Sequence, residues 1–129
     1  MCYFIQAVRY AAKGKEMDKL GKESLLYDFY GELLTKRQQE IYENVRFGDL
    51  SLSEAAETYG ISRQGIHDMI RRSESALEAY EEKLGLVQKF LDNRRDVGAI
   101  RTLAERIRTT QDLSLLNEIS ALAQRIEDR

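Results

Sequence analysis

The residues best suited to chemistry in this chain are long polar side chains between residues 63 and 72. Guanidinium and amide groups can donate paired hydrogen bonds to phosphates or to the edges of bases. Arg63 could contact a phosphate or the O6/N7 edge of guanine, and Gln64 could pair with adenine. Arg71 and Arg72, two turns further on, suit phosphate contacts that set orientation rather than read sequence.

Three further residues complete this candidate nucleic-acid-binding set. Two of them open an earlier predicted helix, whose N-terminal backbone amides favour anions. The third is the only histidine of the chain. The alternative is that all of these are ordinary surface charges on a helix pair used for protein contact. The full set is Arg63, Gln64, His67, Arg71, Arg72, Lys36 and Arg37.

The sequence offers no catalytic or metal-binding constellation. One histidine without cysteine or carboxylate partners at suitable spacing does not make a zinc site. No Gly-rich phosphate loop, Gly-x-Ser-x-Gly or His-Glu-x-x-His motif occurs in the chain. We therefore predict that the protein is not an enzyme, and that it has no catalytic residue, no bound metal and no cofactor.

The elements that must position the polar set are a short helix, a tight turn and a second helix. Ser51 and Glu54 have the spacing of a capping box, which begins the short helix. Gly60 stands where a left-handed residue ends a helix, and Ser62 can cap the next one. Residues 50–72 thus have the layout of a helix-turn-helix.

Apolar spacing predicts further helices on both sides of this unit. One runs over residues 24–34, capped by Ser24, and the next begins at a capping box from Thr35 to Gln38. Two short C-terminal stripes follow a predicted break at Asp92-Asn93 and Gly98. The apolar residues assigned to these faces are Leu25, Leu26, Phe29, Leu33 and Leu34, then Ile41, Tyr42 and Val45, then Ile66, Met69 and Ile70, then Ile100, Leu103 and Ile107, and finally Leu115 to Ile126.

The second helix of the motif is predicted to continue as a heptad seam over residues 66–91. Apolar residues there alternate spacings of four and three, which is the pattern of a coiled coil. Two interpretations stay open, a long helix packed on its own domain and a homodimer contact. The seam comprises Ile66, Ile70, Ser73, Leu77, Tyr80, Leu84, Val87 and Leu91.

Composition limits the class of protein. The chain has 129 residues, 43% of them hydrophobic and 33% charged, with no proline, so helices are free to run and an all-α fold is predicted. A net charge of −2 leaves room only for a small basic patch. One cysteine and no apolar run of about 20 residues predict a cytoplasmic protein without membrane insertion.

The chain is predicted to have three parts. Residues 1–16 pattern poorly with the rest and are interpreted as an upstream extension or a disordered segment, with Met17 as an alternative start. Residues 17–91 form the helix-turn-helix domain, a core of three to four helices with a long recognition helix. Residues 92–129 form a C-terminal helical tail, rich in arginine, that is either merely solvated or a phosphate-contacting arm.

Three motifs carry a resemblance to known families. Leu34-Thr-Lys-Arg-Gln38, Ser51-Leu-Ser-Glu-Ala-Ala56 and Tyr59-Gly-Ile-Ser-Arg-Gln64 resemble region four of bacterial sigma factors. Joined to Leu25-Leu-Tyr-Asp-Phe-Tyr-Gly-Glu-Leu-Leu-Thr35 and Ala79-Tyr-Glu-Glu-Lys-Leu84, they are similar to the YlxM family of small bacterial proteins.

The resemblance implies a sigma-region-four-like helix-turn-helix and genes beside those of the signal recognition particle, with no catalytic residue attached to the family. It suggests a regulatory protein of the targeting pathway, whose partners are DNA or the protein or RNA of that particle. The alternative is a sequence-specific DNA-binding transcriptional regulator without a targeting role.

Overall fold

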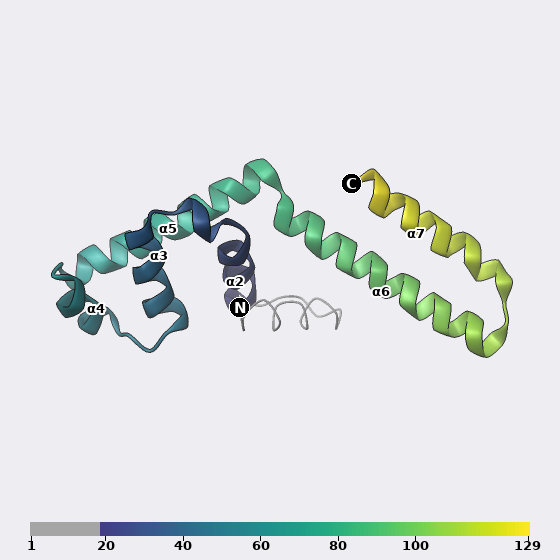
Figure 1. The fold of residues 1–129 in the computed structure, drawn as a ribbon, viewed down its shortest axis with the longest axis horizontal. Helices are drawn as coiled ribbons and strands as arrows, with labels where there is room; N and C mark the ends of the chain where they lie inside the picture. The colour runs from purple at the N-terminus through teal and green to yellow at the C-terminus, as the bar shows by residue number, and fades with distance from the viewer. Residues whose placement is uncertain (1–18) are drawn as a thin grey trace. The chain divides into compact units, whose positions relative to one another are not determined.

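The computed structural model describes residues 19–129, and these residues are almost wholly helical (Figure 1). No strand occurs among them, so the predicted all-α class is confirmed. The chain divides into two compact units, one formed by Glu23–Gly85 and the other including Leu86–Arg129. The predicted extension over residues 1–16 lies outside the described residues.

The first unit contains the predicted helix-turn-helix. Its elements are α2 (Lys19–Tyr30), the 3-10 turn η1 (Gly31–Leu33), α3 (Lys36–Tyr42), the π-helical turn η2 (Glu43–Phe47), α4 (Leu52–Tyr59) and α5 (Arg63–Leu84). Helix α5 packs against both α3 and α4. The core is made by buried residues from each helix, including Leu25, Ile41, Ala55, Ile66 and Leu77.

The first helix corrects two predictions. Because α2 begins at Lys19, Ser24 lies inside the helix and is buried, and it does not cap it. The chain then tightens into a 3-10 turn at Gly31, which shifts the helical period. As a result Leu33, predicted to be buried, is 55% exposed, whereas Leu34 is buried.

Both predicted capping boxes are confirmed. The Thr35 hydroxyl accepts from the Gln38 backbone at 3.2 Å, and the Gln38 side chain accepts from the Thr35 backbone at 3.0 Å. Ser51 and Glu54 make the same reciprocal pair, with both distances at 3.1 Å. Each box satisfies two backbone N–H groups that the first helical turn leaves without partners.

An aromatic cluster lies beside the core of this unit. Tyr42 stacks on Tyr27 with ring centroids 5.2 Å apart, and Phe47 lies edge-on to Tyr42 at 5.6 Å. The Tyr42 hydroxyl is buried and finds no hydrogen-bond partner among the described residues. Burial raises the pKa of Tyr42 well above its ordinary value, because the phenolate would be poorly solvated there.

Replacing Tyr42 by phenylalanine is expected to raise the free energy of unfolding by about 1 kcal/mol, because it removes a buried polar group without a partner. Urea unfolding measures the change. The control is Tyr30→Phe, since the Tyr30 hydroxyl donates to the Glu81 carboxylate at 2.6 Å. That variant is expected to lose about 1 kcal/mol. Equal destabilisation of both variants would contradict the prediction.

The helix that was predicted to carry the heptad seam over residues 66–91 ends before residue 91. Helix α5 stops at Leu84, and Gly85 adopts the left-handed conformation with φ 63°, donating to the Glu81 carbonyl at 2.8 Å. A single helix through residue 91 is therefore wrong. The first four seam residues, from Ile66 to Leu77, are buried within the first unit, whereas Leu84 is 55% exposed. The homodimer stays a prediction, with Leu84 the exposed end of the α5 seam.

The second unit is a helical hairpin. It contains α6 (Leu86–Thr110), the 3-10 turn η3 (Leu113–Leu115) and α7 (Leu116–Asp128), and α6 packs along α7. The predicted break at residues 92–93 and 98 is wrong, because α6 runs through it. The side chain of Asp92 accepts from Gln88 at 3.1 Å, one helical turn away, and so supports the helix there. Asp112 caps the 3-10 turn η3, because its side chain accepts a hydrogen bond from the Ser114 backbone at 3.1 Å.

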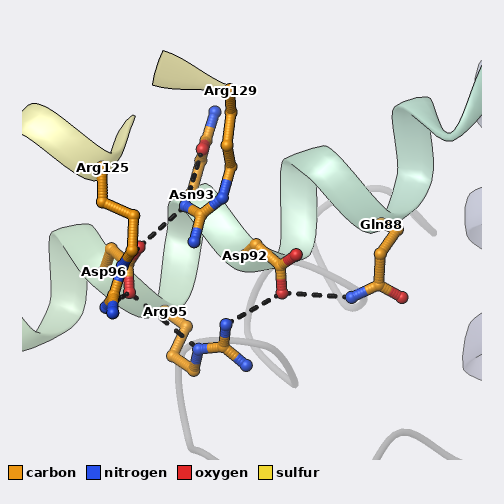
Figure 2. A network of polar contacts seen from close by, with 7 residues as sticks. All are labelled: Gln88, Asp92, Asn93, Arg95, Asp96, Arg125 and Arg129. Atoms are coloured by element: carbon orange, nitrogen blue, oxygen red, sulfur yellow. Dashed lines mark hydrogen bonds and ion pairs between the residues drawn. The ribbon is translucent and has the colours of Figure 1, made fainter. Parts of the chain in front are cut away.

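A charged cluster joins the two helices of the hairpin (Figure 2). Asp96 of α6 is 1% exposed and accepts two hydrogen bonds from Arg125 of α7, at 2.6 and 2.9 Å. Arg129 adds an ion pair to Asp96 at 2.7 Å and donates to Asn93 at 3.1 Å. Hydrogen bonding from Arg125, followed by Arg129, lowers the pKa of Asp96 to about 2.

No helix of the described part of the chain is long and apolar enough to cross a membrane.

Candidate nucleic-acid interface

The turn between α4 and α5 is built by two residues. Gly60 has φ 66° and ψ 31°, which is the left-handed conformation. Glycine adopts this conformation without the steric penalty that other residues incur. Ile61 then donates to the Ala56 carbonyl at 3.2 Å. The Ser62 hydroxyl accepts from the Gly65 backbone at 3.0 Å and so begins α5. The predicted helix-turn-helix elbow is thus present in the structure.

Helix α5 has a buried face and an exposed face, as its period predicts. Ile66 is 0% and Ile70 3% exposed, and Met69 is half-buried. The five candidate residues on this helix are all exposed. They lie within the first ten residues of α5, and they are Arg63, Gln64, His67, Arg71 and Arg72. The structure therefore brings these side chains to one surface, and their role in binding stays a prediction.

Asp68 is the acidic member of this surface, and it engages its neighbours. The Gln64 amide donates to the Asp68 carboxylate at 3.0 Å. The Nδ1 of His67 lies 3.9 Å from the same carboxylate oxygen. The amide nitrogen of Gln64 has a second N–H, so it could hydrogen-bond with a base edge while it still contacts Asp68. Arg63 is exposed and makes no ion pair within the described residues.

A shallow hollow lies further along the same side of α5. It is lined by Asp68, Arg71, Arg72 and Ser75, so that two guanidinium groups border one concave area. Such a pair suits a phosphate, which accepts paired N–H donors from arginine.

Arg46 is a neighbour of this surface that sequence reasoning missed. It forms a hydrogen-bonded ion pair with Glu74, which comes just after Arg71 and Arg72 on α5. The pair neutralises the first of the glutamates that follow the basic turns. The two residues are 28 positions apart in the chain, so no local pattern could have indicated the contact.

The candidate residues on α3 are divided by the structure. Both are exposed at the helix N-terminus, as predicted. The Arg37 guanidinium, however, donates to the Tyr59 carbonyl at the end of α4, at 3.3 Å. It ties α3 to the helix that precedes the elbow, where a cation also complements the helix dipole. Neither Lys36 nor Arg37 forms an ion pair with a described residue, and of the two only Arg37 has a side-chain hydrogen bond there.

No group of three or more histidine, cysteine or acidic residues in the described part of the chain could hold a metal ion.

Comparison with known proteins adds independent information. Residues 17–116 match the model of the family UPF0122, described as "Putative helix-turn-helix protein, YlxM / p13 like". A UPF0122 protein of Thermoanaerobacter sp. (strain X514) is 44% identical over 106 residues, which cover 81% of this chain and 91% of the relative. A UPF0122 protein of Acetivibrio thermocellus is 44% identical over 113 residues, covering 88% and 94%.

A third relative, a UPF0122 protein of Bacillus cereus (strain AH187), is 42% identical over 87 residues, which cover 67% of this chain and 79% of the relative. The family description names a helix-turn-helix protein and no enzyme activity. The elbow at Gly60 and Ser62, and the family match that spans it, lead to the same conclusion: this chain belongs to the YlxM-like UPF0122 family of helix-turn-helix proteins.

Proposed function

We propose that this protein is a cytoplasmic regulator that binds a nucleic-acid duplex through the first three turns of α5. The observation that carries the proposal is the exposure of five polar side chains at the start of a helix whose opposite face is buried. In helix-turn-helix proteins, N-terminal residues of the second helix reach the base edges of the DNA major groove. Arg63 and Gln64 occupy that place here.

We expect two kinds of contact between the protein and the duplex. Arg71, Arg72 and Lys36 would contact phosphates and set the orientation of α5. Arg63 would then contact a base edge, and Gln64 would pair with adenine through its amide oxygen and the N–H that it does not donate to Asp68. Arg37 would serve the interface indirectly, by holding the end of α4 in place.

The test is binding of duplex DNA, enriched with the wild-type protein from a random-sequence pool, over a range of salt concentrations. Arg71→Glu is expected to weaken binding at least tenfold for all sequences and to lower the salt dependence, because a phosphate contact is lost. Arg63→Ala is expected to cost about 1–3 kcal/mol and to relax sequence preference. Lys83→Ala, an exposed cation at the far end of α5, is the control.

If Arg63→Ala and Arg71→Glu bind the enriched duplex as tightly as the wild type does, the α5 surface is not the DNA interface.

A role in the signal recognition particle pathway is the second candidate. The observation that favours it is the acidic surface that follows the basic turns of α5, including the exposed Glu78 and Glu82. A protein partner needs no basic footprint, and the resemblance to YlxM proteins noted in the sequence implies that pathway. A-form RNA has a deep, narrow major groove that side chains cannot read, so RNA contact would use phosphates or loops. Affinity purification of the tagged protein from cells tests this role, and an eluate without particle protein or RNA would contradict it.

A further inference from the structure

Helix α6 carries a row of arginines on the side away from α7. Arg94, Arg101 and Arg108 are each seven residues apart, which places them on one face of a helix at steps of about 10.5 Å. All three are exposed. Asp96 and Leu103 each follow a member of the row by two positions, so they lie roughly opposite it, and both are buried. We call Arg94, Arg101 and Arg108 the arginine stripe.

The ion pairs of the hairpin leave the stripe positive. Helix α6 has six basic residues and three acidic ones, Asp92, Asp96 and Glu105. Asp96 is paired with Arg125 of α7 and with Arg129, which follows that helix. Asp92 pairs with Arg95 at 3.0 Å, off the stripe. Two of the three acids are thus neutralised by arginines outside the stripe.

The remaining acid does little to balance the row. Glu105 lies 3.7 Å from Arg108, but the two side chains are 65% and 80% exposed, and such a pair is weak in water. Arg94 and Arg101 form no ion pair with any residue that the structure describes. The stripe therefore keeps a net positive charge, over about 21 Å from the first to the last arginine.

The composition of the face indicates its ligand. A protein interface is centred on a buried aromatic or aliphatic anchor, whereas the residues between the arginines on this side are small or polar and all exposed, namely Val97, Gly98, Thr102, Ala104 and Glu105. The face carries no Asn or Gln that could read a base. Evenly spaced guanidinium forks match the repeated charge of a phosphate backbone.

We propose that the arginine stripe of α6 binds the phosphodiester backbone of duplex nucleic acid without regard to sequence. The proposal rests on the proposed function for the class of ligand only, because it concerns a different unit of the chain and different residues. The stripe would add affinity that is independent of sequence to whatever preference α5 provides.

The test compares two triple variants of the full chain that remove the same charge from the same helix. The stripe variant is Arg94→Gln, Arg101→Gln and Arg108→Gln. The control variant is Lys89→Gln, Arg95→Gln and Arg106→Gln, which changes exposed residues on the other sides of α6. Fluorescence anisotropy measures binding to a labelled 20-base-pair duplex of arbitrary sequence, as DNA in one arm and as RNA in the other.

The stripe variant is expected to bind at least tenfold more weakly at 50 mM salt, with the salt slope lowered by about 2–3, because up to three phosphate contacts are lost. The control is expected to change affinity less than threefold, and Arg→Lys at all three stripe positions is expected to retain most of it. Thermal melting by circular dichroism verifies that each variant is folded. The DNA and RNA arms show which backbone geometry the stripe prefers.

Two results would overturn the proposal. One is an equal loss of binding in the stripe and control variants, which would mean that only net charge matters. The other is displacement of the duplex by poly-L-glutamate at equal charge concentration, which would identify the stripe as a surface for acidic proteins. Failure of the α5 surface is recognised separately, because Arg63→Ala and Arg71→Glu leave the stripe intact.

Discussion

Replacing Ile66 by alanine is expected to lower the free energy of unfolding by about 2–5 kcal/mol. Ile66 is 0% exposed on α5, which packs against α3 and α4. Its loss removes apolar burial and leaves a cavity that the surrounding helices fill only in part. The Ser62 carbonyl accepts a hydrogen bond from the backbone N–H of Ile66 at 3.0 Å. The cavity would therefore form beside the cap that begins α5. Urea unfolding followed by circular dichroism measures the change.

The matched control for this variant is Leu84→Ala. Leu84 belongs to the same apolar seam on the same helix, but it is 55% exposed. Its replacement is expected to change stability by no more than about 0.5 kcal/mol. Similar destabilisation by both variants would mean that α5 buries its seam differently from the structure, for example against a second copy of the chain.

Replacing Asp96 by asparagine is expected to loosen α7 from α6, and it should do so at neutral pH. The carboxylate of Asp96 accepts two hydrogen bonds from Arg125 and forms an ion pair with Arg129. The substituted amide places an N–H donor against these guanidinium donors and removes the negative charge. Hydrogen exchange of the amides of residues 116–128 at pH 7 is expected to accelerate.

The same cluster predicts an acid dependence. The pKa of Asp96 is about 2 in the folded hairpin, below the ordinary value of 3.8, so ionised Asp96 favours the folded form. This contribution is fully present above about pH 4 and is lost as the pH falls toward 2. Thermal melting from pH 6 to pH 2 is expected to show this loss in the wild type but not in Asp96→Asn.

Asp92→Asn is the control for the acid experiment, because Asp92 lies on the same helix and pairs with the exposed Arg95. It is expected to leave both the exchange of α7 and the acid dependence close to those of the wild type. An unchanged exchange rate in Asp96→Asn would show that the apolar contacts of α7 hold the hairpin without the charged cluster.

Local features of the molecule could be read from the sequence. The capping boxes at Thr35 and Ser51 depend on residues three positions apart, and the elbow depends on Gly60 and Ser62. These are short-range preferences of the backbone, so they are visible in the order of residues alone. The exposed and buried faces of the first half of α5 follow from the helical period in the same way.

Helix ends were predicted less well than helix faces. A glycine or a capping residue indicates a helix end locally, but tertiary packing can override it. Gly85 ends α5, whereas Gly98 lies inside α6, although both positions read as breaks from sequence. A glycine in a helix costs only about 1 kcal/mol, an amount that packing offsets readily. The start of α2 at Lys19 shows the same limit, because Ser24 is suited to a cap but is buried in the helix.

The sequence by itself determined the all-α class, the helix-turn-helix and the residues that face outward at the start of α5. Only the tertiary structure decided which arginines already contact other groups of the protein. Arg37 donates to the Tyr59 carbonyl, Arg46 pairs with Glu74, and Arg125 and Arg129 pair with Asp96. The physical reason is the separation along the chain over which each interaction acts. Helical period and capping act over three or four residues, whereas these contacts join groups at least 22 positions apart.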